Sequence, residues 1–284
     1  LTCYTSFLSS ALKGPSAKVL RCMPKVKALV LRTAGTNCDL ETEYAFKQAG
    51  AETHRIHINR VLEKKDLLHS YHILVLPGGF TYGDDIAAGK ILANLLRFHL
   101  EESIRKFLQD GKLVIGICNG FQALVKSRLL PALDSSNNAQ EATLTFNDSN
   151  RFEARWVHLK VCSGKSVYVD NGQLLYLPVA HAEGKFVIRD NKVLDRLRGS
   201  SQILFKYVNE RGESAGYPYN PNGSVDGIAG VCDPTGRILG MMPHPERYVE
   251  PIQHPHWQRG GLDTEPHGMQ IFRNAVKYVG KNLL

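Results

Sequence analysis

Residues 112–125 read KLVIGICNGFQALV, and this stretch decides the fold. The run from Lys112 to Ile117 is apolar after its first residue and leads into Cys118, and the segment Phe121–Val125 that follows is helical in character. A strand that is apolar throughout and gives way directly to a helix is typical of a parallel sheet covered on both faces. We therefore expect a buried parallel strand here, with a cysteine at its carboxyl end.

The first half of the chain repeats this pattern of strand and helix. Helical spacing covers Asp39–Ala49, which stops at Gly50, and Ile86–Leu108, with one interruption near His99. Alternating strands and helices predict an α/β fold with an open, mostly parallel, doubly wound sheet. The further strands expected in this half are Val26–Leu31, Glu52–Ile58 and Ile73–Leu76.

Beyond Leu133 the chain changes to short β-type stretches separated by polar turns. This pattern predicts a small antiparallel or mixed extension, in which the turn Asp233–Gly236 joins the last two strands as a hairpin. A short helix is expected at Val193–Leu197, and a final helix is expected over Met269–Val279. The expected strands are Ala139–Thr145, Arg155–Val161, Val167–Val169, Leu174–Val179, Ile203–Val208, Gly227–Cys232 and Ile238–Met242.

Charge is unevenly distributed along the 284 residues. The formal net charge is 35 − 27 = +8, and residues 1–27 contribute five cations and no acid, which leaves 30 − 27 = +3 for the rest. So small a surplus gives no dense basic face, and we expect no nucleic-acid partner. Residues 1–23 are expected to be a leader that is disordered, a transit peptide or not native, and residues 24–284 are expected to form a single domain.

Cysteines and apolar runs narrow the class of protein further. The six cysteines are scattered without a CxxC pair, so neither a disulfide framework nor a zinc site is indicated, and a reducing compartment is expected. No apolar run approaches the roughly 20 residues that a membrane helix needs. We therefore expect a cytoplasmic protein with no bound metal and no membrane partner.

Cys118 stands in the sequence pattern of a nucleophile elbow. Gly116 and Gly120 flank it and allow the sharp turn that lifts a side chain out of the sheet edge, and the following helix directs its first N–H groups at the group under attack. The helix N-terminus and a nearby imidazole would both favour the thiolate. Most buried cysteines are simply small apolar residues, but the two glycines at this junction favour a nucleophile.

An attacking thiolate needs a base, and two segments offer one. His181-Ala182-Glu183 and His244-Pro245-Glu246 each follow an expected strand, and each places a histidine and an acid two residues apart. That spacing lets the carboxylate bind one ring nitrogen while the other nitrogen faces the sulfur. Pro243 and Pro245 stiffen the second segment, but the residues alone leave both pairs open.

Pro77-Gly78-Gly79 closes another parallel strand, at the edge where ligands bind in open α/β sheets. Glycine lets a backbone N–H approach a substrate oxygen, as an oxyanion hole requires, and one such donor is commonly worth about 2.7–4 kcal/mol of the barrier. Other side chains of interest fit structural roles. Asp84 and Asp85 precede a helix and are expected to act as N-terminal caps or as favourable charges. Structural roles are also expected for Cys38, Cys162 and Cys232 as core or loop thiols, and for His254 and His256 as solvated loop residues.

Together these segments resemble a class I, triad-type glutamine amidotransferase. The motifs that carry the resemblance, in order, are Leu76-Pro77-Gly78-Gly79-Phe80, Gly116-Ile117-Cys118-Asn119-Gly120-Phe121-Gln122 and Pro243-His244-Pro245-Glu246-Arg247. Within that family, the glutaminase subunits of phosphoribosylformylglycinamidine synthase are similar at four segments, Gly35–Asp39, Thr81–Asp84, Arg151–Glu153 and Met242–Arg247. The likeness runs from about Lys25 to Val279 and implies a flavodoxin-like sheet.

The resemblance implies a role for each matching residue. Cys118 would attack the side-chain amide of glutamine, His244 would act as base and then as acid, and Glu246 would orient His244. The segment His181–Gly184 would then be a loop near the side that faces a partner. The remaining implied contacts are the backbone N–H groups of Gly79 and Asn119 in the oxyanion hole, and Gln122 and Phe80 at the bound glutamine.

The resemblance also implies partners. Ammonia released at neutral pH would be mostly unreactive ammonium, so it has to pass directly to a synthetase subunit. This chain has no G-x-x-x-x-G-K-[ST] phosphate loop, so we expect no cofactor here, and ATP and Mg are expected on the synthetase. The implied complex, with a small bridging subunit, converts formylglycinamide ribonucleotide to formylglycinamidine ribonucleotide in purine biosynthesis.

Two other functions compete with this interpretation. A cysteine hydrolase or deglycase on the same type of sheet also presents a cysteine on an elbow, but such proteins commonly carry histidine directly after it, where Asn119 stands here. A non-catalytic binding subunit would keep the fold without turnover. The presence of Cys118, His244 and Glu246 argues against that alternative.

Overall fold

Strand β4 (Leu113–Ile117) is buried at every residue and is an inner strand of a nine-stranded sheet in the computed structural model. Its neighbours β3 (Ile73–Leu76) and β11 (Ile238–Met241) run parallel to it. Beyond β3, the parallel part continues with β1 (Lys27–Arg32) and β2 (Glu52–His57). The order β2-β1-β3-β4-β11 confirms the predicted parallel sheet.

An antiparallel extension continues the same sheet past β11. Strand β10 (Ile228–Cys232) forms the predicted hairpin with β11, and β9 (Ile203–Val208), β6 (Glu153–Val161) and β7 (Leu174–His181) follow in that order. A separate two-stranded ribbon pairs β5 with β8 in antiparallel fashion. Its strands are β5 (Ala142–Thr145) and β8 (Lys185–Ile188). The predicted extension is therefore present.

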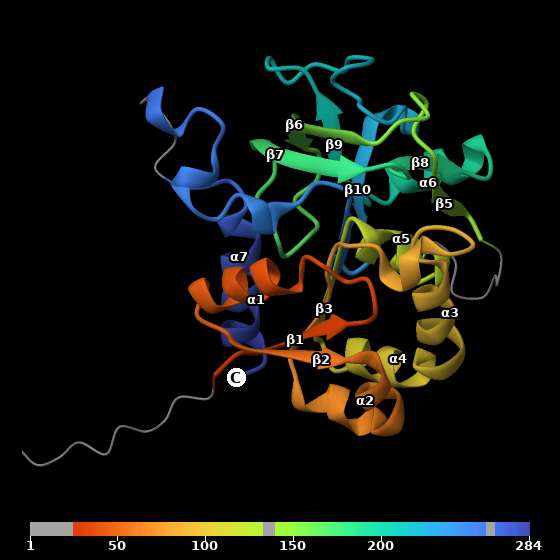
Figure 1. Ribbon diagram of the computed structural model, residues 1–284, viewed down its shortest axis with the longest axis vertical. Helices are drawn as coiled ribbons and strands as arrows, with labels where there is room; N and C mark the ends of the chain where they lie inside the picture. The colour runs from red at the N-terminus through yellow and green to blue at the C-terminus, as the bar shows by residue number, and fades with distance from the viewer. Residues whose placement is uncertain (1–24, 133–139, 260–264) are drawn as a thin grey trace, which may run out of the picture.

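Helices cover both faces of the parallel strands, as a doubly wound sheet requires (Figure 1). On one face lie α1 and α7, where the rings of Phe46 and Phe272 meet edge to face with centroids 4.9 Å apart. The other face carries α3, α4 and α5, and the break between α3 and α4 falls near His99, as predicted. The helices are α1 (Asp39–Gln48), α2 (Ile58–Glu63), α3 (Lys90–His99), α4 (Glu101–Gln109), α5 (Asn119–Lys126), α6 (Asn191–Gly199) and α7 (Met269–Asn282).

Local details differ from the sequence-based expectations. The expectation of a strand at Val167–Val169 is wrong, because this segment is a turn. The turn buries the Tyr168 ring, whose hydroxyl donates to the carbonyl oxygen of Val114 at 2.9 Å. Helix α2 was missed because it follows β2 directly, with no turn residues between them. No element was expected at β8, a strand of four residues that depends on pairing with β5.

The structure describes residues 25–132, 140–259 and 265–284. The expected leader at residues 1–23 lies outside the described residues, as does Ala139 at the start of an expected strand. Within the described ranges, no helix is both long and apolar enough to cross a bilayer. The assignment of residues 24–284 to a single domain stays a prediction.

Close backbone packing sets the position of α5 against the sheet. A Cβ atom at Gly120 would lie 1.9 Å from the carbonyl oxygen of Leu76 in β3. A Cβ atom at Gly116 would lie 2.7 Å from the carbonyl oxygen of Gly120. The first turn of α5 therefore contacts the sheet through backbone atoms, and this contact determines how deeply the preceding residue, Cys118, is seated.

We expect Gly120→Ala to lower the free energy of unfolding by about 1–3 kcal/mol, because an added methyl group meets backbone that cannot rotate away. Urea-induced unfolding of the full chain measures this. Gly280→Ala in α7 is the matched control: its added Cβ meets nothing within 4 Å, and alanine favours a helix. Equal unfolding midpoints for the two variants would contradict the close contact of α5 with β3.

Candidate active site

Cys118 occupies a strained turn between β4 and α5. Its backbone has φ 50° and ψ −105°, a conformation that costs a non-glycine residue on the order of 1–3 kcal/mol. Its N–H donates to the carbonyl oxygen of Met241 at 2.8 Å, and its own carbonyl oxygen accepts from the N–H of Gln122 at 3.0 Å. The residue is 5% exposed, and the thiol lies 3.7 Å from the carbonyl oxygen of Ala180. The backbone thus adopts the expected elbow.

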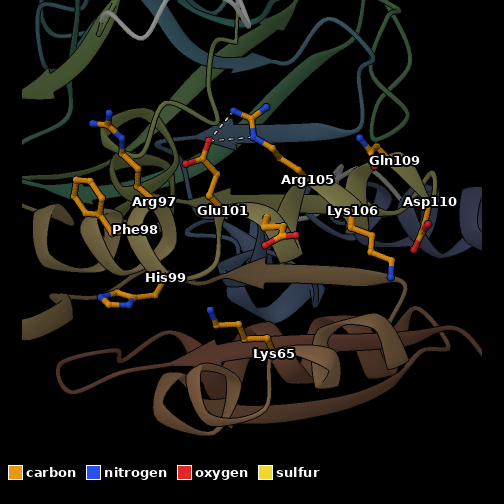
Figure 2. A pocket seen from close by; sticks show the side chains of 10 residues that line it. Lys65, Arg97, Phe98, His99, Glu101, Arg105, Lys106, Gln109 and Asp110 are labelled. Atoms are coloured by element: carbon orange, nitrogen blue, oxygen red, sulfur yellow. Dashed lines mark hydrogen bonds and ion pairs between the residues drawn. The ribbon is translucent and has the colours of Figure 1, made fainter.

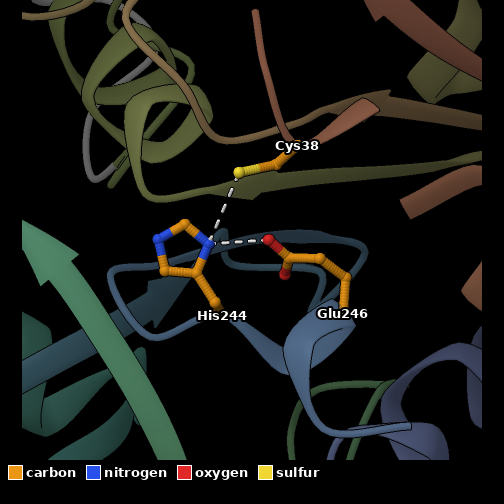
Figure 3. Close-up of side chains that lie close together, drawn as sticks. All are labelled: Cys38, His244 and Glu246. Atoms are coloured by element: carbon orange, nitrogen blue, oxygen red, sulfur yellow. Dashed lines mark hydrogen bonds and ion pairs between the residues drawn. The ribbon is translucent and has the colours of Figure 1, made fainter. Parts of the chain in front are cut away.

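His244 and Glu246 lie in a buried turn that follows β11. The Nδ1 atom of His244 donates to Oε1 of Glu246 at 2.6 Å, and the two side chains are 2% and 0% exposed. Within the described residues, Nε2 of His244 has no hydrogen-bond partner, and Figure 3 shows this nitrogen pointing away from the carboxylate. The pairing of Met241 with Ile117 brings this turn level with the elbow at Cys118.

Two neighbouring groups oppose the effect of burial on the pKa of His244. Burial alone would lower the pKa of His244, but the Glu246 carboxylate and the Cys118 sulfur raise this pKa well above its ordinary value. A raised pKa means that the surroundings favour the imidazolium. An imidazolium next to a thiol is the arrangement that favours a thiolate nucleophile.

His181, the other candidate base, is held in a structural network. It ends β7, is 3% exposed, donates from Nδ1 to Oδ1 of Asn147 at 3.1 Å and lies with Nε2 3.5 Å from Nδ2 of Asn222. Burial, with a smaller contribution from His244, lowers the pKa of His181 to about 3, so this ring stays neutral. The expected loop is confirmed for residues 182–184, which connect β7 to β8, whereas His181 is the last residue of β7 and its ring is held by buried asparagines.

Glu183 does not bind the neighbouring His181 and instead joins separate segments. Its carboxylate accepts from the N–H of Ala88 at 3.2 Å and lies 3.6 Å from Nζ of Lys126, which itself donates to the carbonyl oxygen of Ala88 at 2.6 Å. The carbonyl oxygen of Glu183 accepts from Nε2 of Gln122 at 2.7 Å. Glu183 therefore links α5 to the segment that precedes α3.

The expected oxyanion loop packs against the loop that precedes α1. Gly79 has φ 143° and forms an isolated bridge with Thr36, and a Cβ atom at Gly79 would lie 2.7 Å from the backbone nitrogen of Asn37. Glycine is therefore required at this position. Across the site, Asn119 begins α5, and the first N–H of a helix has no acceptor inside the helix. That N–H is available to a substrate oxygen.

The side chain of Asn119 connects this loop to α5. Its Oδ1 accepts from the hydroxyl of Thr81 at 2.6 Å, and its Nδ2 donates to Oδ1 of Asp84 at 2.9 Å. Helix α3 begins only at Lys90 and has no side-chain cap, so the interpretation of Asp84 as a cap is wrong, although its Oδ1 also accepts from the N–H of Gly89 at 3.4 Å. A role as a favourable charge stays a prediction. Burial, more than any other cause, raises the pKa of Asp84.

The two residues expected to bind glutamine differ in their surroundings. The Gln122 amide is already engaged: its Oε1 accepts from Nδ2 of Asn119 at 2.9 Å, and its Nε2 donates to Glu183. Phe80 is 46% exposed next to Gly79. The structure thus gives Gln122 a role in joining α5 to the Glu183 segment, and contact of either residue with glutamine stays a prediction.

Cys38 is a site residue that the sequence-based analysis missed. It is buried, as predicted, but its sulfur lies 4.0 Å from Nδ1 of His244 (Figure 3). Among the described residues, Cys38, His244 and Glu246 are the one group whose candidate metal-ligand atoms all lie within 4.8 Å of each other. The sulfur, however, already accepts from Nη2 of Arg247 at 3.1 Å, and a guanidinium beside a ligand atom opposes a cation. The absence of a metal stays a prediction.

The remaining candidates lie away from Cys118. Cys232 is buried and Cys162 is exposed, both as free thiols, in agreement with their predicted structural roles. His256 is exposed as expected, but His254 is half-buried against the ring of Trp156, with centroids 5.5 Å apart, so its interpretation as a solvated residue is wrong.

An open groove of about 760 Å³ lies along α4 and the end of α3 (Figure 2). Its charges are mixed, and Arg105 pairs with Glu101 at 2.7 Å across one helical turn. The residues that line it include none of the predicted site residues. The groove therefore adds nothing to the candidate active site.

Comparison with known proteins identifies the family. A family model described as the CobB/CobQ-like glutamine amidotransferase domain matches residues 25–279. The chain belongs to this family. Membership confirms the predicted resemblance to glutamine amidotransferases. Because the match concerns the whole domain, the roles of Cys118, His244 and Glu246 stay predictions.

Individual relatives within this family are similar along almost their whole length. The phosphoribosylformylglycinamidine synthase subunit PurQ of Dehalococcoides mccartyi is 48% identical over 257 residues, covering 90% of this chain and 98% of that protein. The subunit of the same name from Archaeoglobus fulgidus is 41% identical over 271 residues, covering 90% and 98%. A chain in the PurLQS structure from Thermotoga maritima is 29% identical, with a TM-score of 0.68 over 90% of this chain and 100% of that one. This structural similarity confirms the predicted fold class.

We expect His181→Gln to flatten the pH dependence of stability below pH 6.5. With a folded pKa of about 3 and an ordinary value of 6.5, His181 binds a proton only in the unfolded chain between these pH values, so stability falls as the pH falls through this window. The slope from this residue is at most about 1.4 kcal/mol per pH unit. Urea-induced unfolding at several pH values between 7.5 and 5 measures this slope, because that range covers the start of the window. The exposed His256→Gln is the control, and equal slopes for His181→Gln and the unmutated chain would refute neutral burial.

Proposed function

We propose that this chain is the glutaminase subunit of a phosphoribosylformylglycinamidine synthase. It hydrolyses glutamine to glutamate and ammonia, and the ammonia serves the conversion of formylglycinamide ribonucleotide to formylglycinamidine ribonucleotide. The observation that carries this proposal is the buried turn of His244 and Glu246 next to the elbow of Cys118. Similarity to PurQ subunits over nearly their full length supports the choice of reaction.

The mechanism follows from the positions of the three side chains. The Cys118 thiolate attacks the amide carbon of glutamine, and His244 donates a proton to the departing ammonia. Water then hydrolyses the γ-glutamyl thioester, with His244 accepting its proton. The 2.6 Å bond from Nδ1 to Glu246 leaves Nε2 as the nitrogen that exchanges protons at the reacting atoms.

Charge on the substrate oxygen requires hydrogen-bond donors during both additions. The backbone N–H groups of Gly79 and Asn119 are proposed for this role, because Gly79 lies at the carboxyl end of β3 and Asn119 begins α5. Phe80 and Gln122 are proposed to contact the bound glutamine. The Gln122 amide already bonds to Asn119 and Glu183, so it would contact glutamine through its remaining N–H donor or oxygen lone pair.

A synthetase subunit is the proposed recipient of the ammonia. The relatives carry the name of a synthase subunit, and one similar chain comes from a PurLQS structure. Low exposure of Cys118 and His244, at 5% and 2%, suits a reaction whose product is handed on rather than released into water. We also propose a small bridging subunit, ATP and Mg on the synthetase, and a cytoplasmic location.

In the complex with the synthetase, we expect Cys118→Ala to reduce ammonia release from glutamine by about 10³-fold or more, because the variant lacks the sulfur that is proposed to form the thioester. Synthesis of the amidine from added ammonium should persist, which shows that the complex is intact. Cys162→Ala is the control, since this exposed thiol is remote from the elbow. Unchanged ammonia release by Cys118→Ala would exclude the proposed nucleophile.

The isolated chain should hydrolyse glutamine slowly, because its candidate site is enclosed. We expect addition of the synthetase subunit with ADP and Mg to raise glutamine hydrolysis at least about 10-fold, a modest coupling free energy. Release of ammonia from glutamine, measured with and without the synthetase, provides the comparison. Equally rapid hydrolysis by the isolated chain would refute control by the partner.

A further inference from the structure

The Cys38 thiol lies between the imidazole of His244 and the guanidinium of Arg247. Its sulfur is 4.0 Å from Nδ1 of His244 and accepts a hydrogen bond from Nη2 of Arg247 at 3.1 Å. Its own proton is directed to Oδ1 of Asn37 at 3.1 Å. With 1% of its surface exposed, Cys38 is a fixed part of the interior.

Arg247 follows Glu246 directly in the chain and is a potential competitor for its carboxylate. Oε1 of Glu246 accepts from His244, but none of the described residues donates to Oε2, although this oxygen is buried. Guanidinium is the side-chain group best suited to bind a carboxylate, through paired N–H donors. In the structure, Arg247 instead contacts Cys38 and lies 3.8 Å from Oε1 of Glu41.

We propose that Cys38 is a positioning residue, whose sulfur holds the guanidinium of Arg247 away from Glu246 and so keeps the Glu246 carboxylate on His244. The inference rests on the proposed function of Cys118 and His244, and it adds a residue to which the family resemblance assigned no chemistry.

The packing around Cys38 fixes its thiol against the imidazole of His244. A Cβ atom at Gly78 would lie 2.8 Å from Cε1 of His244 and 3.2 Å from the sulfur of Cys38. The N–H of Cys38 donates to the carbonyl oxygen of Gly78 at 3.2 Å, which fixes the loop against the end of β3. The sulfur therefore sits in a closed space between backbone and imidazole.

A neutral thiol suits this position better than a charged side chain would. Burial, the largest cause, raises the pKa of Cys38, and contact with His244 offsets this only in part. At neutral pH the group accepts a hydrogen bond from Arg247 without bringing a second negative charge to the imidazole. Glu246 then remains the carboxylate that stabilises the imidazolium of His244.

Several charged or titratable groups face His244, and each element packed on it contributes. Glu246 and Arg247 come from its own turn, Cys38 from the loop before α1, Cys118 from the end of β4 and His181 from the end of β7. Of these groups, Arg247 is the cation that can be redirected. If it pairs with Glu246, the imidazolium is less stable, and the thiolate of Cys118 forms only at higher pH.

The test measures glutaminase kcat/KM against pH in the full chain bound to its synthetase. We expect Cys38→Ala to move the midpoint of the acid limb upward by about half a pH unit or more. At pH values below the midpoint, this shift equals a loss of kcat/KM of about threefold. Cys38→Ser, which keeps an acceptor for Arg247, should shift it less. The double variant Cys38→Ala with Arg247→Gln should restore the original midpoint, because the competing cation is gone.

The same variants distinguish positioning from simple packing. Alkylation of Cys118 by iodoacetamide, followed on its own peptide across the same pH range, should show the same order of midpoints as turnover. An acid limb that Cys38→Ala leaves in place overturns the inference, and so does a shift that Arg247→Gln fails to reverse. If Cys38→Ala does not fold, Cys38→Ser is compared with Cys38→Gly, which lacks an acceptor. Equal shifts of the acid-limb midpoint in these two variants overturn the role of the acceptor.

Failure of this inference can be separated from failure of the proposed function. Continued ammonia release by Cys118→Ala would remove the nucleophile and with it the proposed function. Loss of release by Cys118→Ala, together with an unshifted Cys38→Ala profile, would leave the function in place and overturn only the role of Cys38.

Discussion

The parallel pairing of β4 with β11 is the constraint on which the candidate site depends. Met241 lies beside Ile117, so both strands end at the same edge of the sheet. Cys118 and His244 are 244 − 118 = 126 residues apart in the chain, yet each follows one of these strands closely. Because both strands are fully buried, their ends form a rigid base for the thiol and the imidazole.

Around this base, hydrogen bonds between loops enclose the site. The loop at Asn37 and Cys38 packs on the end of β3, and Asn119 ties α5 to Asp84. On the other side, Glu183 joins Lys126 and the backbone of Ala88. Charges inside such an enclosure act on each other strongly, because little water screens them. Local changes at the rim therefore reach the imidazole through a few defined contacts.

The predicted and observed structures agree where the signal is local. The apolar run before Cys118 and its flanking glycines predict a strand, a sharp turn and a helix, and each is present. The strand expected at Val167–Val169 is absent because the Tyr168 hydroxyl finds its acceptors at Val114 and Arg237, which no local pattern reveals. The spacing of His181 and Glu183 equals that of His244 and Glu246, so sequence physics could not choose between them.

By itself, the sequence determined the parallel sheet, the elbow at Cys118 and the motifs of the family, because periodicity and glycine placement act over a few residues. Only the tertiary structure decided that His181 is bound by asparagines, that Glu183 binds Lys126 and that Cys38 touches His244. These contacts join distant parts of the chain. They depend on the register of the whole sheet, which is set when all its strands pack together.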